Sequence, residues 1–225
     1  MLIDVSYPYM AVMAIYPGNP GFEVMRVQDL EKGDNANVSL FSMGTHTGTH
    51  IDAPSHFVLG GKTIDQIPLE TMNGTAKLFD LRGNDEITRE LLMQYDIATG
   101  DIIVLKTDNS QIFHSDKVLD DYVTLDYGAA EYLAEKGIKM VCTDYMTIER
   151  PRAKRVSGKS IHSILLSKEI LIAETLNLAD VEEGEYQLYC FPINLSGVDG
   201  TPVRIILSTV ILRWWKIERD LVIRQ

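Results

Sequence analysis

Short apolar runs dominate the hydrophobic pattern of the chain. They are rich in β-branched and aromatic residues, and the polar stretches between them carry Gly, Asn and Asp, a pattern typical of strands and turns. Extended segments are therefore predicted at residues 2–6, 37–43, 76–81, 102–107, 138–143, 170–174, 187–193 and 203–207.

Two other segments show the period of an amphipathic helix. Residues 86–95 and 127–136 repeat apolar side chains on one face, and the second segment ends at Gly137, a residue favoured after helix C-termini. A third, shorter helix is predicted to begin near Ser160 or Ile161. Strands outnumber helices and alternate with them irregularly, so periodicity alone predicts a mixed α/β domain.

Length and composition favour one globular domain over residues 1–225. The chain is 45% hydrophobic, enough for a sizeable core, and it has no internal repeat and no Pro/Gly/Ser-rich linker. Its net charge is −11, from 32 acidic and 21 basic residues, which opposes binding to a nucleic-acid backbone. The one basic cluster, residues 150–159, is interpreted as a solvated loop because it lacks aromatic stacking partners. No nucleic-acid partner is expected.

The cysteines and the amino terminus indicate a reducing compartment. Cys142 and Cys190 lie in apolar runs without metal-ligand spacing, so buried, reduced thiols are favoured over a disulfide. Asp4 stands where a secretion signal would carry Lys or Arg, and no apolar run approaches the ~20 residues of a membrane span. We therefore expect a cytoplasmic protein without a membrane partner.

A dense group of metal-ligand side chains lies between His46 and His56. These eleven residues hold three of the five histidines and an aspartate, and imidazole and carboxylate are the usual ligands of catalytic zinc. Gly48 and Pro54 disfavour a helix here. In an extended chain His46, His50 and Asp52 share one face, but four residues would span ~13 Å, too far for the two histidines to share an ion. Gly48 is therefore predicted to bend the chain.

Two other interpretations of this segment stay open. Its side chains could satisfy backbone groups in a polar turn, or they could hold a purely structural metal. A closed structural zinc site usually contains cysteine, and this segment contains none. Three protein ligands that leave a position for water are instead typical of a catalytic metal.

The pattern His-x-Gly-Thr-His-x-Asp-x-Pro-x-His resembles the signature of the cyclase-like metal-dependent hydrolase family, which includes bacterial kynurenine formamidases and isatin hydrolases. The resemblance continues over most of residues 3–207, through short pieces at residues 3–6, 16–20, 100–105, 143–145, 174–178 and 199–204. It implies a single α/β domain of the swivelling β/β/α type, with a mixed, barrel-like β core and flanking helices.

The resemblance also implies the site. Five residues would bind metal, with Asp52 able to bridge two ions; they are His46, His50, Asp52, His162 and Glu174. Zinc is the favoured ion, with manganese or iron as alternatives. His56 would be the catalytic histidine, its alternative being a residue that only orients a ligand. Tyr16 would form an aromatic wall for the substrate or simply pack in its loop.

The implied function is hydrolysis of a small amide by metal-activated water, with an aryl formamide such as N-formylkynurenine as the favoured substrate. Opening of a cyclic amide, as in isatin hydrolases, is the alternative reaction, and a non-catalytic metal-binding module is the alternative class. A homodimer or higher homo-oligomer is expected, with the amino-terminal loop crossing to a neighbour. Residues 208–225, including Trp214 and Trp215, form a C-terminal extension atypical of the family, which would cover the core or contact a second subunit.

Overall fold

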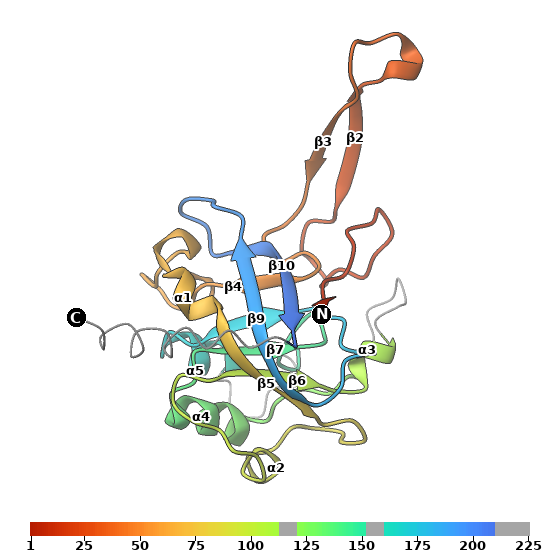
Figure 1. Cartoon of the computed structure of the whole chain (residues 1–225). Coiled ribbons are helices and arrows are strands. Elements are labelled where there is room, and N and C mark those ends of the chain that lie inside the picture. The colour runs from red at the N-terminus through yellow and green to blue at the C-terminus, as the bar shows by residue number, and fades with distance from the viewer. Residues whose placement is uncertain (113–120, 152–159, 210–225) are drawn as a thin grey trace, which may run out of the picture.

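A mixed β-sheet that closes on itself forms the centre of the molecule (Figure 1). The structure is a computed structural model that describes residues 1–112, 121–151 and 160–209. Its strands are β1 (Leu2–Asp4), β2 (Glu23–Gln28), β3 (Val38–Ser42), β4 (His50–Asp52), β5 (Gly74–Asp80), β6 (Ile102–Lys106), β7 (Met140–Thr143), β8 (Leu171–Glu174), β9 (Gly184–Pro192) and β10 (Gly200–Ser208). Within the described residues, seven strands close a barrel in the order β10-β4-β8-β7-β6-β5-β9, because β9 pairs again with β10, and β1 joins the sheet beside β10.

Strand β10 closes the barrel by pairing with different strands along its length. Residues 200–202 pair with β4, and residues 203–208 pair with β9. Strands β5, β6, β7 and β8 are parallel to one another, whereas β4 is antiparallel to both β8 and β10. The short strand β4 is therefore held between β8 and β10, with His50 opposite Glu174 on one side and Pro202 on the other.

The parallel strands are buried on both faces, which explains their continuous apolar sequences. In β6, Ile102 and Val104 belong to the core inside the barrel, whereas Ile103 and Leu105 belong to a second core outside it. The alternation follows from the two-residue period of a strand.

Helices α2 (Arg89–Leu92), α4 (Tyr127–Lys136) and α5 (Ile161–Leu166) cover the outer side of the parallel strands (Figure 1). Other short helices are α1 (Leu69–Met72), whose Met72 belongs to the core inside the barrel, and α3 (Asn109–Ile112), and 3₁₀ turns lie at Leu30–Lys32, Pro54–His56 and Ile64–Gln66. The longest, α4, begins where the Asp126 carboxylate accepts from Ala129 N and ends at Gly137 with φ +66°. Among the described residues, no helix is long and apolar enough to cross a membrane.

Strands β2 and β3 form a two-stranded arm that projects from the barrel (Figure 1). We call these two strands and their connection, residues 23–42, the β2–β3 arm. Every residue in the two strands is exposed, including Val24, Met25, Leu40 and Phe41. The arm therefore presents apolar side chains to solvent on both of its faces.

The fold confirms the predicted mixed α/β class with a barrel-like β core and flanking helices. All eight predicted extended segments contain a strand, and residues 127–136 are helical as predicted. The helix predicted at residues 86–95 is wrong in extent: α2 covers only Arg89–Leu92, because the Thr88 side chain caps it by accepting from Leu91 N and Ile87 bridges to Leu125. The short strands β2 and β4 and the short helices α1 and α3 were not among the predicted segments.

Two sequence predictions fall partly or wholly outside the described residues. The Trp214–Trp215 tail lies beyond residue 209, and most of the basic cluster lies within residues 152–159. Their interpretations, and that of a single domain over residues 1–225, stay predictions.

Candidate metal centre

A bend at Gly48 brings His46 and His50 together. Gly48 has φ +63°, and a Cβ atom there would lie 2.6 Å from Cε1 of Tyr9. The side chain at this position must therefore be hydrogen, and the backbone needs the left-handed conformation that glycine adopts readily. The two imidazole rings lie with centroids 5.1 Å apart, as the predicted bend requires.

Asp52 lies at the centre of the cluster. Its carboxylate is fully buried, with Oδ1 at 2.8 Å from Nδ1 of His46 and 3.4 Å from Nε2 of His50. Its other oxygen, Oδ2, lies 3.5 Å from Nε2 of His162. The two oxygens thus face two different sets of imidazoles.

Two elements far along the chain complete the cluster. Glu174, at the end of β8, places Oε2 at 3.5 Å from Nε2 of His50 and Oε1 at 3.2 Å from Nε2 of His162 on α5. The backbone N–H of Ile148 donates to Oε1 over 2.7 Å and fixes the carboxylate. Two groups result, one of His46, His50 and Asp52 and one of Asp52, His162 and Glu174, and within each the candidate ligand atoms lie within 4.8 Å of one another. Asp52 is common to both.

The donor set fits a divalent cation. Nδ1 of His50 lies 2.8 Å from the Gly48 carbonyl oxygen and donates to it, so Nε2 is the ring nitrogen that faces the oxygens of Asp52 and Glu174. Oδ2 of Asp52 is buried without a hydrogen-bond partner. Lone pairs that face one another in a buried site are costly unless a proton or a cation lies among them.

Two histidines of the cluster have raised pKa values. Burial lowers the pKa of His46, but Asp52 and Asp199 outweigh it and raise that pKa to about 9. Burial also lowers the pKa of His162, but Glu149, Glu174 and Asp52 raise it to about 10. Burial and the nearby Asp52 raise the pKa of Glu174. A metal ion that binds here must therefore displace protons from imidazole nitrogens.

Glu149 was not predicted from the sequence and lies behind His162. It is 3% exposed, with Oε1 at 3.0 Å from Nδ1 of His162, and it accepts from Ser160 Oγ over 2.8 Å and from Ile161 N over 2.6 Å. These contacts hold the imidazole so that its Nε2 faces Asp52 and Glu174. A lone Glu beside a basic cluster gave no sequence signal for this position.

Asp199 was also missed as a site residue, although it lies in one of the pieces that carry the family resemblance. Its Oδ2 lies 2.9 Å from Nε2 of His46 and 3.3 Å from Nδ1 of His56. His56 stacks on His46 with ring centroids 3.8 Å apart and an interplanar angle of 22°. Burial, together with the positive charge on His46 and His162, lowers the pKa of His56 to about 4, against the opposing effect of Asp52.

The predicted substrate residue, Tyr16, lines the cavity above the cluster. This cavity of about 150 Å³ is bounded by Tyr16, Asn19, His56 and four of the five candidate ligands, all but the fully buried Asp52. Tyr16 also borders a neighbouring cavity of about 240 Å³ together with Tyr122 and Tyr145. The structure thus brings every predicted site residue to one place, and the role of each stays a prediction.

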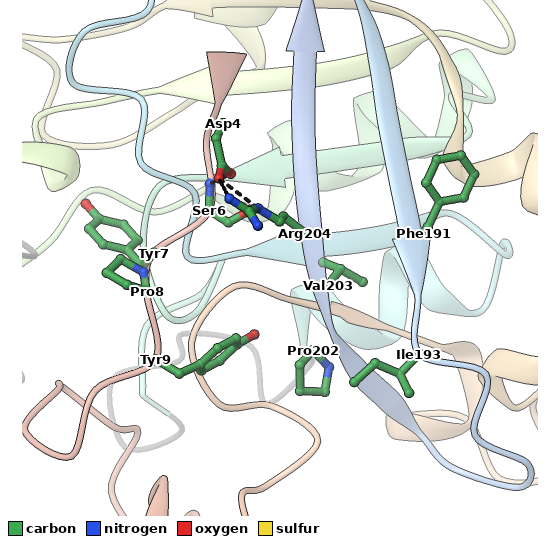
Figure 2. A pocket seen from close by; sticks show the side chains of 10 residues that line it. All are labelled: Asp4, Ser6, Tyr7, Pro8, Tyr9, Phe191, Ile193, Pro202, Val203 and Arg204. Carbon is green, nitrogen blue, oxygen red and sulfur yellow. Dashed lines mark hydrogen bonds and ion pairs between the residues drawn. The ribbon is translucent and has the colours of Figure 1, made fainter. Parts of the chain in front are cut away.

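A larger groove of about 580 Å³ lies elsewhere, beside β1, β9 and β10 (Figure 2). Tyr9, Phe191 and Ile193 line it, together with Asp4 and Arg204, which are joined by a hydrogen bond of 2.6 Å. None of the candidate metal ligands borders it. Its size alone therefore does not make it the reaction site.

Comparison with known proteins identifies the family. The Cyclase family matches residues 3–150, about two thirds of the chain. This protein belongs to that family. A kynurenine formamidase of Bacillus cytotoxicus is 30% identical over 205 residues, which cover 91% of this chain and 96% of that protein. A structure described as a "potential metal-dependent hydrolase with cyclase activity" is 38% identical, with a TM-score of 0.79 and coverage of 92% of this chain and 96% of that one.

The fold is shared more widely than the sequence. Isatin hydrolase A of Ralstonia solanacearum superposes with a TM-score of 0.81 at 19% identity, covering 92% of this chain and 91% of that chain. At this identity the similarity shows a common fold only.

Proposed function

We propose that this cyclase-family protein is a metal-dependent hydrolase of a small amide, with an aryl formamide such as N-formylkynurenine as its substrate. The observation that carries the proposal is the pair of ligand groups that share the buried Asp52, with His56 beside them. The similarity to kynurenine formamidases over nearly the whole chain supports the choice of substrate.

Five residues would hold the metal: His46, His50, Asp52, His162 and Glu174. Zinc suits imidazole and carboxylate ligands, and manganese or iron are the alternatives. Two ions would agree with the two ligand groups, which have Asp52 in common. A divalent ion supplies acidity to water and polarises a carbonyl oxygen.

His56 would move the proton. Its Nδ1 faces Asp199, so Nε2 on the other side of the ring is the atom available toward the cavity. Its lowered pKa of about 4 means that the neutral, basic form is present near pH 7. Nε2 would take a proton as water adds to the amide carbon, and would return it to the nitrogen as the C–N bond breaks, which releases formate and the aryl amine.

The side chains around the cavity suit an aryl leaving group. Tyr16 separates the metal cavity from the neighbouring cavity, where the rings of Tyr122 and Tyr145 stack with centroids 4.2 Å apart. An aromatic ring placed against another gains ~0.5–1.5 kcal/mol beyond the burial of its area. Tyr16→Ala should therefore reduce the preference for aryl over alkyl formamides.

Metal content and turnover, measured together, test the proposal. Asp52→Ala should lose metal and activity, whereas His56→Ala should keep metal and lose roughly 10²–10⁴-fold in turnover. His114→Ala, which changes the one remaining histidine of the sequence, is the matched control. Unchanged metal content in folded Asp52→Ala would refute the site.

The same preparations test the substrate. Zinc-loaded enzyme should hydrolyse N-formylkynurenine faster than isatin or a simple alkyl formamide. Faster opening of isatin would assign the cyclic-amide reaction, and a metal-loaded protein that hydrolyses none of these amides would be a binding module instead.

We further propose that a second copy of this chain covers the β2–β3 arm. On one face of the arm, Val24 and Phe41 are each 57% exposed. On the other face, Met25 is 59% exposed and Leu40 is 57% exposed. A lone two-stranded hairpin is marginally stable in water, so these faces need a partner whenever the chain is folded. The arm contains about 20 residues, near the 20–30 that a standard interface uses on each side. A two-fold arrangement would cover both arms with the same contact.

Light scattering after size exclusion measures this association. The wild type should be a dimer or a higher oligomer, and the double variant Met25→Ser, Leu40→Ser should shift toward the monomer. Leu69→Ser, at a 50% exposed position on α1, is the control and should leave the mass unchanged. A monomeric wild type at micromolar concentration would overturn the proposal.

A further inference from the structure

Asp199 connects the loop before β10 to both halves of the site. Its backbone oxygen accepts from Ala53 N over 2.9 Å, which ties it to the segment that leads into His56. Its Oδ1 accepts from Thr45 Oγ1 over 3.2 Å, beside His46. The carboxylate is thus anchored on two sides, and its Oδ2 faces the two stacked imidazoles.

The geometry points to Asp199 as the positioning residue that sets the tautomers of His46 and His56. One oxygen, Oδ2, lies within reach of Nε2 of His46 and Nδ1 of His56, at 2.9 and 3.3 Å. An ionised carboxylate only accepts hydrogen bonds, so Nε2 of His46, which is hydrogen-bonded to Asp199, carries a proton, and the facing Nδ1 of His56 is the nitrogen that this carboxylate favours for its proton. Nδ1 of His46, which lies 2.8 Å from Oδ1 of Asp52, is then the nitrogen that a metal ion would use once its proton is displaced, and His56 offers the lone pair of Nε2 toward the cavity. The inference rests on the proposed function only for the role of His56 as a base.

This arrangement accounts for the stacking of two imidazoles in one small space. A single carboxylate fixes the metal-facing nitrogen of one ring and the proton-accepting nitrogen of the other. An outer carboxylate that orients a ligating imidazole is a common feature of metal sites, and an aspartate that orients a basic histidine is common in hydrolases. Asp199 would serve both purposes at once.

Asp199→Asn is the informative substitution because it keeps the shape of the side chain. A neutral amide oxygen accepts more weakly than a carboxylate oxygen, and the amide nitrogen, where it faces the rings, can only donate. The amide N–H would donate to Nδ1 of His56, which favours the tautomer with its proton on Nε2. In that tautomer Nε2 has no lone pair and cannot act as the base. A wrong tautomer of a catalytic histidine costs up to ~10⁴-fold in turnover in the serine protease triad. We expect Asp199→Asn to lower kcat by about 10²–10⁴-fold with little change in KM.

A double-variant cycle separates positioning of His56 from a general effect. If Asp199 acts on turnover through His56, then Asp199→Asn added to His56→Ala should cause little further loss, measured with excess zinc so that both proteins are loaded. Asp65→Asn on the adjacent loop is the matched control, since its carboxylate binds Thr63, Ser196 and Gly197 and contacts neither histidine. A full, independent loss in the double variant would overturn the assignment.

A measurement of the tautomers keeps the inference testable even if no amide is turned over. Nitrogen chemical shifts of ¹⁵N-histidine-labelled, zinc-loaded protein report which ring nitrogen carries the proton, and His56→Ala assigns the signals. The wild type should show His56 protonated at Nδ1, and Asp199→Asn should change that pattern while Asp65→Asn does not. A wild-type His56 protonated at Nε2 would refute the inference independently of the reaction.

Discussion

Replacing Gly48 by alanine tests whether the bend at this residue sets the geometry of the centre. The substitution has two costs. The first is the left-handed backbone, φ +63°, which costs an L-residue about 1–2 kcal/mol. The second is the close approach of the new Cβ to the Tyr9 ring, at 2.6 Å from Cε1, and to Cε of Met13, at 3.1 Å.

The Tyr9 ring cannot move away without losing an interaction. Its hydroxyl donates to the Thr49 carbonyl oxygen over 2.7 Å, and breaking that bond costs about 0.5–1.5 kcal/mol. Forcing a methyl group into a filled space adds about 1–3 kcal/mol. Gly48→Ala should therefore lower the free energy of unfolding by about 1.5–4.5 kcal/mol more than the backbone alone would.

Gly83→Ala provides the backbone control. Gly83 has φ +80°, and a Cβ there would meet no described atom within 4 Å. Urea unfolding of both variants in chelator gives the difference without metal. Because the Gly48 carbonyl accepts from Nδ1 of His50, Gly48→Ala should also weaken zinc about 10–100-fold, whereas Gly83→Ala should not. Equal destabilisation of the two variants, with equal zinc affinity, would show that the contact with Tyr9 does not hold the bend.

Three further predictions concern groups around the centre. Glu149→Gln should weaken zinc binding about 10–100-fold in a competition titration, because the amide holds His162 less firmly than the carboxylate does; unchanged affinity would contradict this. Asp144 accepts from Thr107 and Ser110, and its pKa is raised to about 6 by burial, so Asp144→Asn should cost about 1–3 kcal/mol in urea unfolding with zinc content intact. In chelator, the stabilisation from the raised pKa values of His46 and His162 should be complete below pH ~6.5 and should be lost as the pH rises through about 9 and about 10. A free energy of unfolding that does not fall over that range would contradict the sign.

The barrel and its longest helix were predictable because local signals and packing agree there. The sequence runs that form β6, β7 and β8 carry apolar side chains both at the positions that face the barrel interior and at those that face the outer core. Helix α4 has an acidic cap at Asp126 and glycine at residue 137, so its bounds agreed with the sequence prediction. The sequence did not show where the helix predicted at residues 86–95 begins. Its N-cap is Thr88, so the observed helix α2 is shorter than predicted.

The β2–β3 arm was only half predicted, for a physical reason. Strand β3 was expected from its apolar run, but in β2 the apolar side chains Val24, Met25 and Val27 occur on both faces and follow no two-residue period. An alternation of apolar and polar residues would not stabilise this strand, because neither of its faces packs on the barrel. Its sequence becomes understandable only if something else covers both faces.

One part of the candidate site could be predicted from the sequence, and the other part is recognisable only in the folded structure. Histidines and an aspartate packed into residues 46–56 indicate a metal without any structure. Glu149 gives no such signal, and the only signal for Asp199 is its place in a piece that carries the family resemblance. A lone carboxylate acquires its role only when the chain brings it beside an imidazole, here His162 or His56.

The placement of the site residues would couple metal binding to the assembly of the sheet. The candidate ligands His50 and Glu174 lie on β4 and β8, and Asp199 lies immediately before β10; β4 pairs with both β8 and β10, so these residues meet only when the three strands have paired. His50 lies more than one hundred positions before Glu174 and Asp199 in the sequence, so the complete site exists only in the folded state. A ligand that binds only the folded state stabilises it by RT ln(1 + [L]/Kd), about 4 kcal/mol at a thousandfold excess over Kd. The buried, like-charged carboxylates of Asp52 and Glu174 oppose folding in the absence of a cation, and the same pair would favour folding when one is bound.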